Sequence, residues 1–139
     1  MILKKINSVA DNIFKNLRFF SKLCLRTSLG IAFIIHGLSK FPLPPQKLME
    51  YFGFSSLLAS FVAISELMAG FTIIFALFIK NYIGNLLTRF SALVILIIMI
   101  CAFYFAHKDW FINTKLFTSE QIFLFFIGLY FLINGNKDY

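Results

Sequence analysis

The residues of this chain that can do chemistry are ionisable groups placed inside apolar segments. Arg26, His36 and Lys40 lie within the apolar stretch RTSLGIAFIIHGLSK, and Glu66 lies well inside the next apolar stretch. If these stretches cross a bilayer, a charged carboxylate at its centre costs roughly 2.5–3.5 kcal/mol on insertion scales. We therefore expect Glu66 to be paired with a base, to be protonated or to contact water.

The spacing of the first stretch indicates how these groups are presented. Three-and-four spacing places five residues along one side of a helix: Arg26, Gly30, Phe33, Gly37 and Lys40. His36 lies about 100° round from that line. Two glycines on one side let another helix approach closely, so we expect this side to face protein and its ionisable groups to find partners there.

Glu66 and His36 are the candidate catalytic residues. Counted inward at 1.5 Å per residue, His36 lies about 7 Å deep and Glu66 about 13 Å deep, so that His36 or Lys40 can reach Glu66. A protonatable Glu and His pair suits proton exchange with a quinone or another redox ligand, with Lys40 and Arg26 as cofactor-binding residues. Two alternatives remain open: the charges neutralise one another and set helix register, or Glu66 is unpaired and protonated.

His107 is a further cofactor-binding candidate, at the end of the third apolar stretch. Histidines on different helices can ligate haem or a metal, but a single histidine at a helix end is more often interfacial, so we predict no metal site. Cys24 and Cys101 show no CxxC spacing, and we expect buried, inert thiols. The sequence contains no nucleotide-binding loop, serine triad or thiol pair.

Composition defines the class of protein. The chain has 139 residues, of which 60% are hydrophobic and 14% charged, and its mean hydropathy is +0.85. These values are typical of an integral membrane protein rather than of a soluble domain. The net charge of +7 comes from lysines and arginines beside apolar segments, which indicates membrane topology and contact with anionic lipid and argues against a nucleic-acid partner.

The predicted fold is all-α: a bundle of four transmembrane helices with an N-terminal interfacial amphipathic helix. We place the amphipathic helix at residues 1–20, in the headgroup plane, because its apolar residues recur at helical spacing opposite polar ones. The four-helix domain covers residues 21–139, with spans at about 21–41, 57–79, 86–106 and 118–135. Three prolines after Phe41 stop the first span, and the fourth is short enough to require local thinning of the bilayer.

Charge distribution predicts the orientation. Nine of the 13 lysines and arginines fall on the side of the termini, so both termini are expected in the cytoplasm, with the protein in a bacterial inner membrane. We find neither an internal repeat nor a broken helix, which makes a small-solute carrier the weakest functional hypothesis.

The motifs taken together resemble a known family. R-x3-G-x5-HG-x2-K at Arg26–Lys40, E-x3-G at Glu66–Gly70, Ala102 with His107, and the ending GNKDY at Gly135–Tyr139 resemble the DoxX family of small four-helix membrane proteins. The resemblance covers nearly the whole chain after residue 21, and the N-terminal helix looks like an addition. It implies that the polar positions of the family pattern are Arg26, His36, Lys40, Glu66 and His107.

The expected function combines this resemblance with the buried charges. The family is named for subunits of a thiosulfate and quinone oxidoreductase, which implies a membrane subunit of a redox system, with quinone as the candidate cofactor. The partners are then the lipid bilayer and other membrane or redox subunits, with any catalytic partner on a separate chain. The alternative is a non-catalytic scaffold or assembly subunit of a larger membrane complex, whose buried charges only specify packing.

Overall fold

Every element of the structure, a computed structural model, is a helix wherever the chain is described, that is in residues 2–15, 17–112 and 114–136. In chain order they are α1 (Ile2–Lys15), α2 (Leu17–Leu38), α3 (Gln46–Phe52), α4 (Ser56–Phe75), η1 (Ala76–Phe78), α5 (Tyr82–Ala106), η2 (Lys108–Ile112), α6 (Lys115–Thr118) and α7 (Glu120–Asn134). The predicted all-α class is confirmed for this part of the chain.

Local sequence explains where the long helices begin and end. The proline-rich segment 42–45 separates α2 from α3, since proline lacks the N–H that a helix requires. The Ser55 hydroxyl accepts a hydrogen bond from the Leu58 N–H and caps α4. Asn81 caps α5 through the N–H groups of Ile83 and Gly84, so this helix begins at Tyr82, ahead of the predicted span of 86–106.

Three helices are long and apolar enough to cross a membrane. They are α2, the continuous segment Ser56–Phe78 and α5, with 22, 23 and 25 residues. Large apolar side chains cover their outer surfaces, and Phe61, Phe78 and Phe90 are 67%, 72% and 65% exposed. Such a surface needs an apolar solvent, so the protein is an integral membrane protein. The remaining apolar helix, α7, has 15 residues, and its crossing of the membrane stays a prediction.

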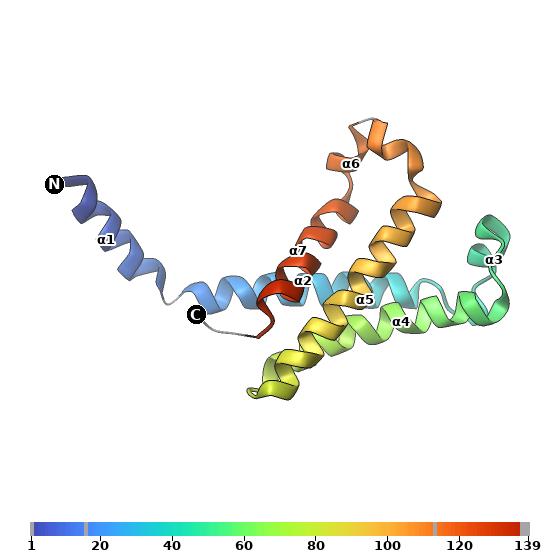
Figure 1. Cartoon of the computed structure of the whole chain (residues 1–139), viewed down its shortest axis with the longest axis horizontal. Helices are drawn as coiled ribbons and strands as arrows, with labels where there is room; N and C mark the ends of the chain where they lie inside the picture. Colours follow the sequence, from blue (N-terminus) through green and yellow to red (C-terminus); the bar gives the residue numbers. More distant parts are fainter. Residues whose placement is uncertain (1, 16, 113, 137–139) are drawn as a thin grey trace.

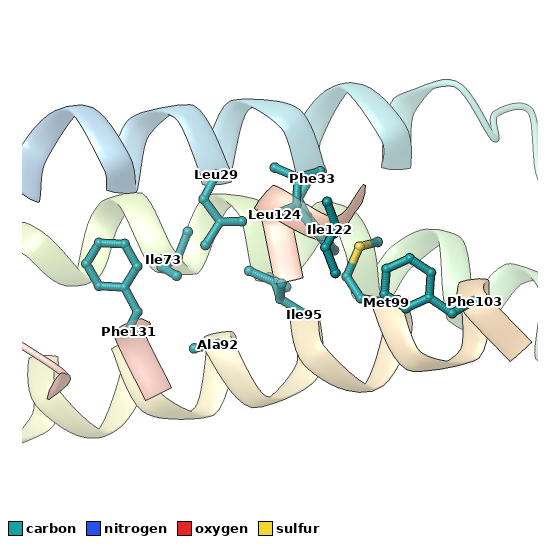
Figure 2. Close-up of a cluster of buried hydrophobic side chains, with 11 residues drawn as sticks. Leu29, Phe33, Ile73, Ala92, Ile95, Met99, Phe103, Ile122, Leu124 and Phe131 are labelled. Atoms are coloured by element: carbon teal, nitrogen blue, oxygen red, sulfur yellow. The ribbon is translucent and has the colours of Figure 1, made fainter. Parts of the chain in front are cut away.

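One hydrophobic core joins α2, α4, α5 and α7. In Figure 1, α2 runs alongside α4 and α5 runs alongside α7, and the residue contacts between these pairs agree. Figure 2 shows the side chains that meet between them, which include Leu29 and Phe33 from α2, Ile73 from α4, Ile95 and Met99 from α5, and Leu124 and Phe131 from α7.

The helix α1 stands apart from this core. It extends away from the other long helices in Figure 1, and within Ile2–Lys15, which is described in full, no side chain is buried. Ile6 and Ile13 are 59% and 61% exposed, which leaves an apolar helix face that the described part of the protein does not cover.

The cysteines differ from expectation. We expected buried thiols, but both Cys24 and Cys101 are exposed. They lie on sides of α2 and α5 that face away from the shared core, where apolar surroundings are expected from lipid rather than from protein. The prediction of buried thiols was therefore wrong.

Glycine allows α2 and α4 to touch through their backbones. A Cβ atom on Gly70 would lie 2.7 Å from the Gly30 carbonyl oxygen and 2.8 Å from the Ile34 backbone nitrogen. One on Gly37 would lie 2.8 Å from the Leu67 backbone nitrogen. The predicted protein-facing side of the first apolar segment is thus confirmed, and its partner is α4.

Alanine at Gly70 is expected to destabilise the protein by about 1–3 kcal/mol, because its methyl group meets backbone atoms of α2 that cannot rotate away. Thermal unfolding of the purified variant in detergent, followed by circular dichroism, measures the loss. The matched control is Gly128→Ala, whose Cβ meets only side-chain atoms, the nearest being Cγ2 of Ile95 at 3.2 Å. Equal unfolding temperatures for the two variants would contradict this account.

Candidate functional site

Glu66 is a buried carboxylate whose partner is Lys40. Glu66 lies on α4 with a 7% exposed side chain, and the Lys40 ammonium forms an ion pair and hydrogen bond with its Oε2. Lys40 follows the end of α2 at Leu38 by two residues, so its long side chain extends from the helix end to reach Glu66. A basic group just beyond the end of the neighbouring helix therefore compensates this acid.

The depth of this ion pair makes it energetically important. Glu66 is ten residues into α4, or about 15 Å from its start at 1.5 Å per residue. That is roughly half of a 30 Å hydrocarbon core. Removing one partner of a buried ion pair typically costs about 3–5 kcal/mol, since an uncompensated charge remains.

His36 contacts a different acid. Its Nε2 lies 3.1 Å from Oε1 of Glu120, the first residue of α7, so the structure does not place the His36 ring on Glu66. The two residues are nevertheless linked, because the Lys40 ammonium also donates to the His36 backbone carbonyl oxygen at 3.3 Å. We call these four residues, Glu66, Lys40, His36 and Glu120, the Glu66 cluster.

The Glu66 cluster connects the surface of the protein with its interior. The side chains of Glu120, His36, Lys40 and Glu66 are 60%, 39%, 19% and 7% exposed. Exposure thus decreases stepwise through groups that can carry charge or a proton. Chemically, this arrangement keeps a buried carboxylate within reach of a partly exposed ammonium group.

Arg26 belongs to a separate site at the other end of α2. Its side chain is 3% exposed, and its Nη1 donates to the Ile73 carbonyl oxygen at 3.1 Å and to the Thr88 hydroxyl at 3.0 Å. Its Nη2 donates to Asn136 Oδ1 at 2.6 Å, and the guanidinium carbon lies 4.8 Å from the centre of the Phe131 ring. Arg26 therefore joins helices rather than belonging to the Glu66 cluster.

Asn136 completes this second site. Its Oδ1 also accepts a hydrogen bond from the Thr88 hydroxyl at 2.6 Å, and its Nδ2 donates to the Ala76 carbonyl oxygen at 2.7 Å. The Asn136 N–H donates to Asn85 Oδ1 at 3.0 Å. Asn136, two residues after the end of α7, thus ties together α2, η1 and α5.

The sequence analysis did not identify Thr88, Asn85 or Asn136 as site residues. Signals for them were present, because Thr88 is a polar residue in a predicted span and Asn136 lies in the GNKDY ending. A polar residue within an apolar span usually has a partner in another helix. Thr88 in the third predicted span and Arg26 in the first were therefore candidates for pairing.

His107 lies at the end of α5, with its ring stacked on Trp110 and the ring centres 3.6 Å apart. Burial lowers the pKa of His107 below its ordinary value of 6.5, and the nearby Asp109 carboxylate offsets part of this effect. Among the described residues, no three His, Cys, Asp or Glu side chains are grouped so that they could hold a metal ion. The observed role of His107 is to pack against the indole.

These features define a small helical membrane protein with a buried, paired carboxylate. Comparison with known families then identifies it: the sequence pattern of the DoxX family matches residues 21–108, well over half of the 139-residue chain. The chain belongs to the DoxX family. No curated protein and no solved structure matches it. The matched region includes Arg26, His36, Lys40, Glu66 and His107, whereas α7 lies outside it.

The fluorescence of Trp110, the only tryptophan in the sequence, is expected to report protonation of His107. Its titration midpoint should lie below 6.5, because burial disfavours the charged ring. His107 then binds a proton less readily in the folded protein than in the unfolded chain. Its contribution to the stability of the protein is therefore present above about pH 6.5 and is lost as the pH falls below that value.

The control variants for this titration are His107→Gln and His36→Gln. The first should abolish the fluorescence transition, and the second should leave it unchanged, because His36 contacts Glu120 rather than the indole. A midpoint above 6.5, or a transition that survives His107→Gln, would show that the stacked ring is not the titrating group.

Proposed function

We propose that this protein is the membrane subunit of a quinone-linked redox system and that Glu66 exchanges protons there. The observation that carries the proposal is a carboxylate buried about halfway along a membrane helix, with a partly exposed lysine as its partner. Ionisable residues inside membrane segments are costly, and they commonly mark proton or substrate sites. The electrons would come from a partner protein on a separate chain.

Lys40 has the donors that such a site requires. An ammonium group has three N–H bonds, and the described contacts of Lys40 use two, to Glu66 and to the His36 carbonyl oxygen. The remaining donor can bind a ligand oxygen beside Glu66. His36 and Glu120, which are more exposed, would take up or release protons at the surface. Their described link to the buried pair is the His36 backbone carbonyl oxygen, which holds the Lys40 ammonium beside Glu66.

A quinone head group suits this donor set. Its carbonyl oxygens accept hydrogen bonds, and its reduction takes up two electrons and two protons. Lys40 would orient a carbonyl oxygen, and Glu66 would supply or accept a proton close to it. The cofactor-binding roles proposed for Arg26 and His107 have less support, because their described contacts join helices and stack on Trp110.

We propose the following membrane arrangement. Residues 21–139 form a four-span domain with both termini in the cytoplasm of a bacterial cell, and α7 is the short fourth span. Support for α7 comes from its packing along α5 and its contribution to the shared core. Residues 1–20 form the interfacial unit, supported by the uncovered apolar face of α1 and its lysines Lys4, Lys5 and Lys15.

A scaffold role is the second candidate, and a specific observation favours it. The ion pair of Lys40 with Glu66 joins the same two helices as the backbone contact of Gly30 with Gly70. Both features would then specify how α2 packs on α4, and the protein would assemble a larger complex without proton chemistry.

Glu66→Gln is expected to abolish proton exchange on ligand binding, because glutamine keeps the shape and hydrogen bonding of the side chain but does not titrate. Calorimetric titration with ubiquinone-1 and ubiquinol-1, in buffers of different ionisation enthalpy, counts the protons exchanged. The wild-type protein should exchange a fraction of a proton that the variant does not. Mass spectrometry of a solvent extract should also find a quinone purified with the wild-type protein.

The double variant Lys40→Gln/Glu66→Gln controls for stability. The single variant leaves a lysine charge without its carboxylate, whereas the double variant replaces the ion pair with a neutral pair that can still form a hydrogen bond. Recovery of stability without recovery of proton exchange supports the redox proposal. Absence of quinone binding by the wild-type protein, with assembly lost in the single variant and regained in the double, would instead identify a scaffold.

A further inference from the structure

The helix α1 has an apolar side that the described part of the protein leaves uncovered. Ile2, Ile6, Val9 and Ile13 recur at intervals of three and four residues, so they lie along one side of the helix. All four are more than half exposed. An apolar side of this kind on a helix requires an apolar surface to pack against.

The place of α1 in the chain brings it to a membrane surface. The helix α2, which is long and apolar enough to cross a membrane, begins at Leu17, two residues after α1 ends at Lys15. In Figure 1, α1 extends from the start of α2 away from the other long helices. Its 14 residues span about 21 Å at 1.5 Å per residue. Because the link is short, the leaflet that α2 enters is the apolar surface within its reach.

The charge of α1 is complementary to an anionic surface. Lys4, Lys5 and Lys15 carry three positive charges against one negative charge on Asp11, which gives a net charge of +2. The Asp11 carboxylate accepts a hydrogen bond from the Asn7 amide at 3.0 Å. In the described part of the chain, no carboxylate pairs with Lys5. Lysines beside a membrane surface are attracted by anionic lipid.

Lys5 differs from the other two lysines in its position on the helix. It lines a shallow groove of about 340 Å³ together with Ile2, Ile6 and Val9, and we call these four residues the α1 groove. Lys5 is three residues after Ile2 and four before Val9, so it flanks the apolar side. Lys4 lies about 100° further round, on the polar side. A lysine at the edge of an apolar side can cover apolar surface with its carbons and hold its charge at the headgroups.

We propose that the α1 groove binds an anionic lipid of the leaflet that α2 enters, with the lipid phosphate on the Lys5 ammonium. Ile6 and Val9 then pack against the glycerol and the first acyl carbons. The proposal rests on the interfacial placement of residues 1–20 proposed above, and it adds the class of lipid and the residue that selects it. It does not depend on proton chemistry at Glu66.

The test follows the docking of α1 in the full-length protein by tryptophan fluorescence in lipid vesicles. Trp110→Phe removes the tryptophan of the chain, and Ile13→Trp then introduces one on the apolar side of α1. Ser8→Trp is the control on the polar side, and both positions are exposed. Brominated phosphatidylglycerol should quench Ile13→Trp strongly and Ser8→Trp weakly. Brominated phosphatidylcholine, which has no net charge, should quench Ile13→Trp less.

Lysine variants test the α1 groove itself. At the phosphatidylglycerol content that docks half of α1, Lys5→Gln should lower the ratio of docked to undocked helix about fivefold, as expected for one lysine at an anionic surface. Lys4→Gln is the matched control, because both lysines are exposed and both variants lose one charge. It should lower the ratio less than about twofold, since its charge lies further from the lipid and is screened by salt.

The possible contrary results separate the two proposals. Absence of quenching in both lipids would overturn the interfacial placement together with the lipid site. Equal quenching by the two lipids would leave the placement intact and overturn the anionic site, as would equal effects of Lys4→Gln and Lys5→Gln. Fluorescence that changes with protein density in the vesicles rather than with lipid charge would identify a second copy of the chain as the occupant.

Discussion

The contact of α2 with α4 is the constraint on which the rest of the structure depends. Gly30 and Gly70 bring the two backbones together, and this close approach lets Lys40 reach an acid on the neighbouring helix. A bulky residue at either glycine would separate the helices and move the ammonium from the carboxylate. Small residues have this role in many membrane helix pairs, where lipid provides no hydrophobic force to bring helices together.

The two ends of α2 use basic residues differently. At one end, Lys40 compensates a single buried acid and stays partly exposed, with mobile carbons between its charge and the backbone. At the other, Arg26 is bound by a hydroxyl, a carbonyl oxygen and an amide. The planar guanidinium group suits several fixed acceptors, whereas the flexible stem of lysine lets a single charge reach an acid beyond the helix end. Arg26 thus joins several segments, and Lys40 reaches one carboxylate.

Sequence reasoning succeeded where a single helix determines the answer. The spacing of Gly30 and Gly37 identified the side of α2 that packs on protein, and a basic partner was one of the three environments expected for Glu66. It could not choose between Lys40 and His36 as that partner. The acid that His36 contacts is Glu120, 84 positions further along the chain, and no local pattern brings these two residues together. The partners of Arg26 depend on residues 62 and 110 positions away, which no local pattern specifies.

The bond between Arg26 and Asn136 has a consequence for biogenesis. Arg26 is synthesised 110 residues before its amide partner Asn136, so the first span leaves the ribosome well before that partner does. Until Asn136 is in place beyond α7, this cation lacks one of its final hydrogen-bond partners. Closure of the helical assembly around Arg26 therefore waits for α7, and a chain cut before Asn136 would leave Arg26 without this hydrogen bond.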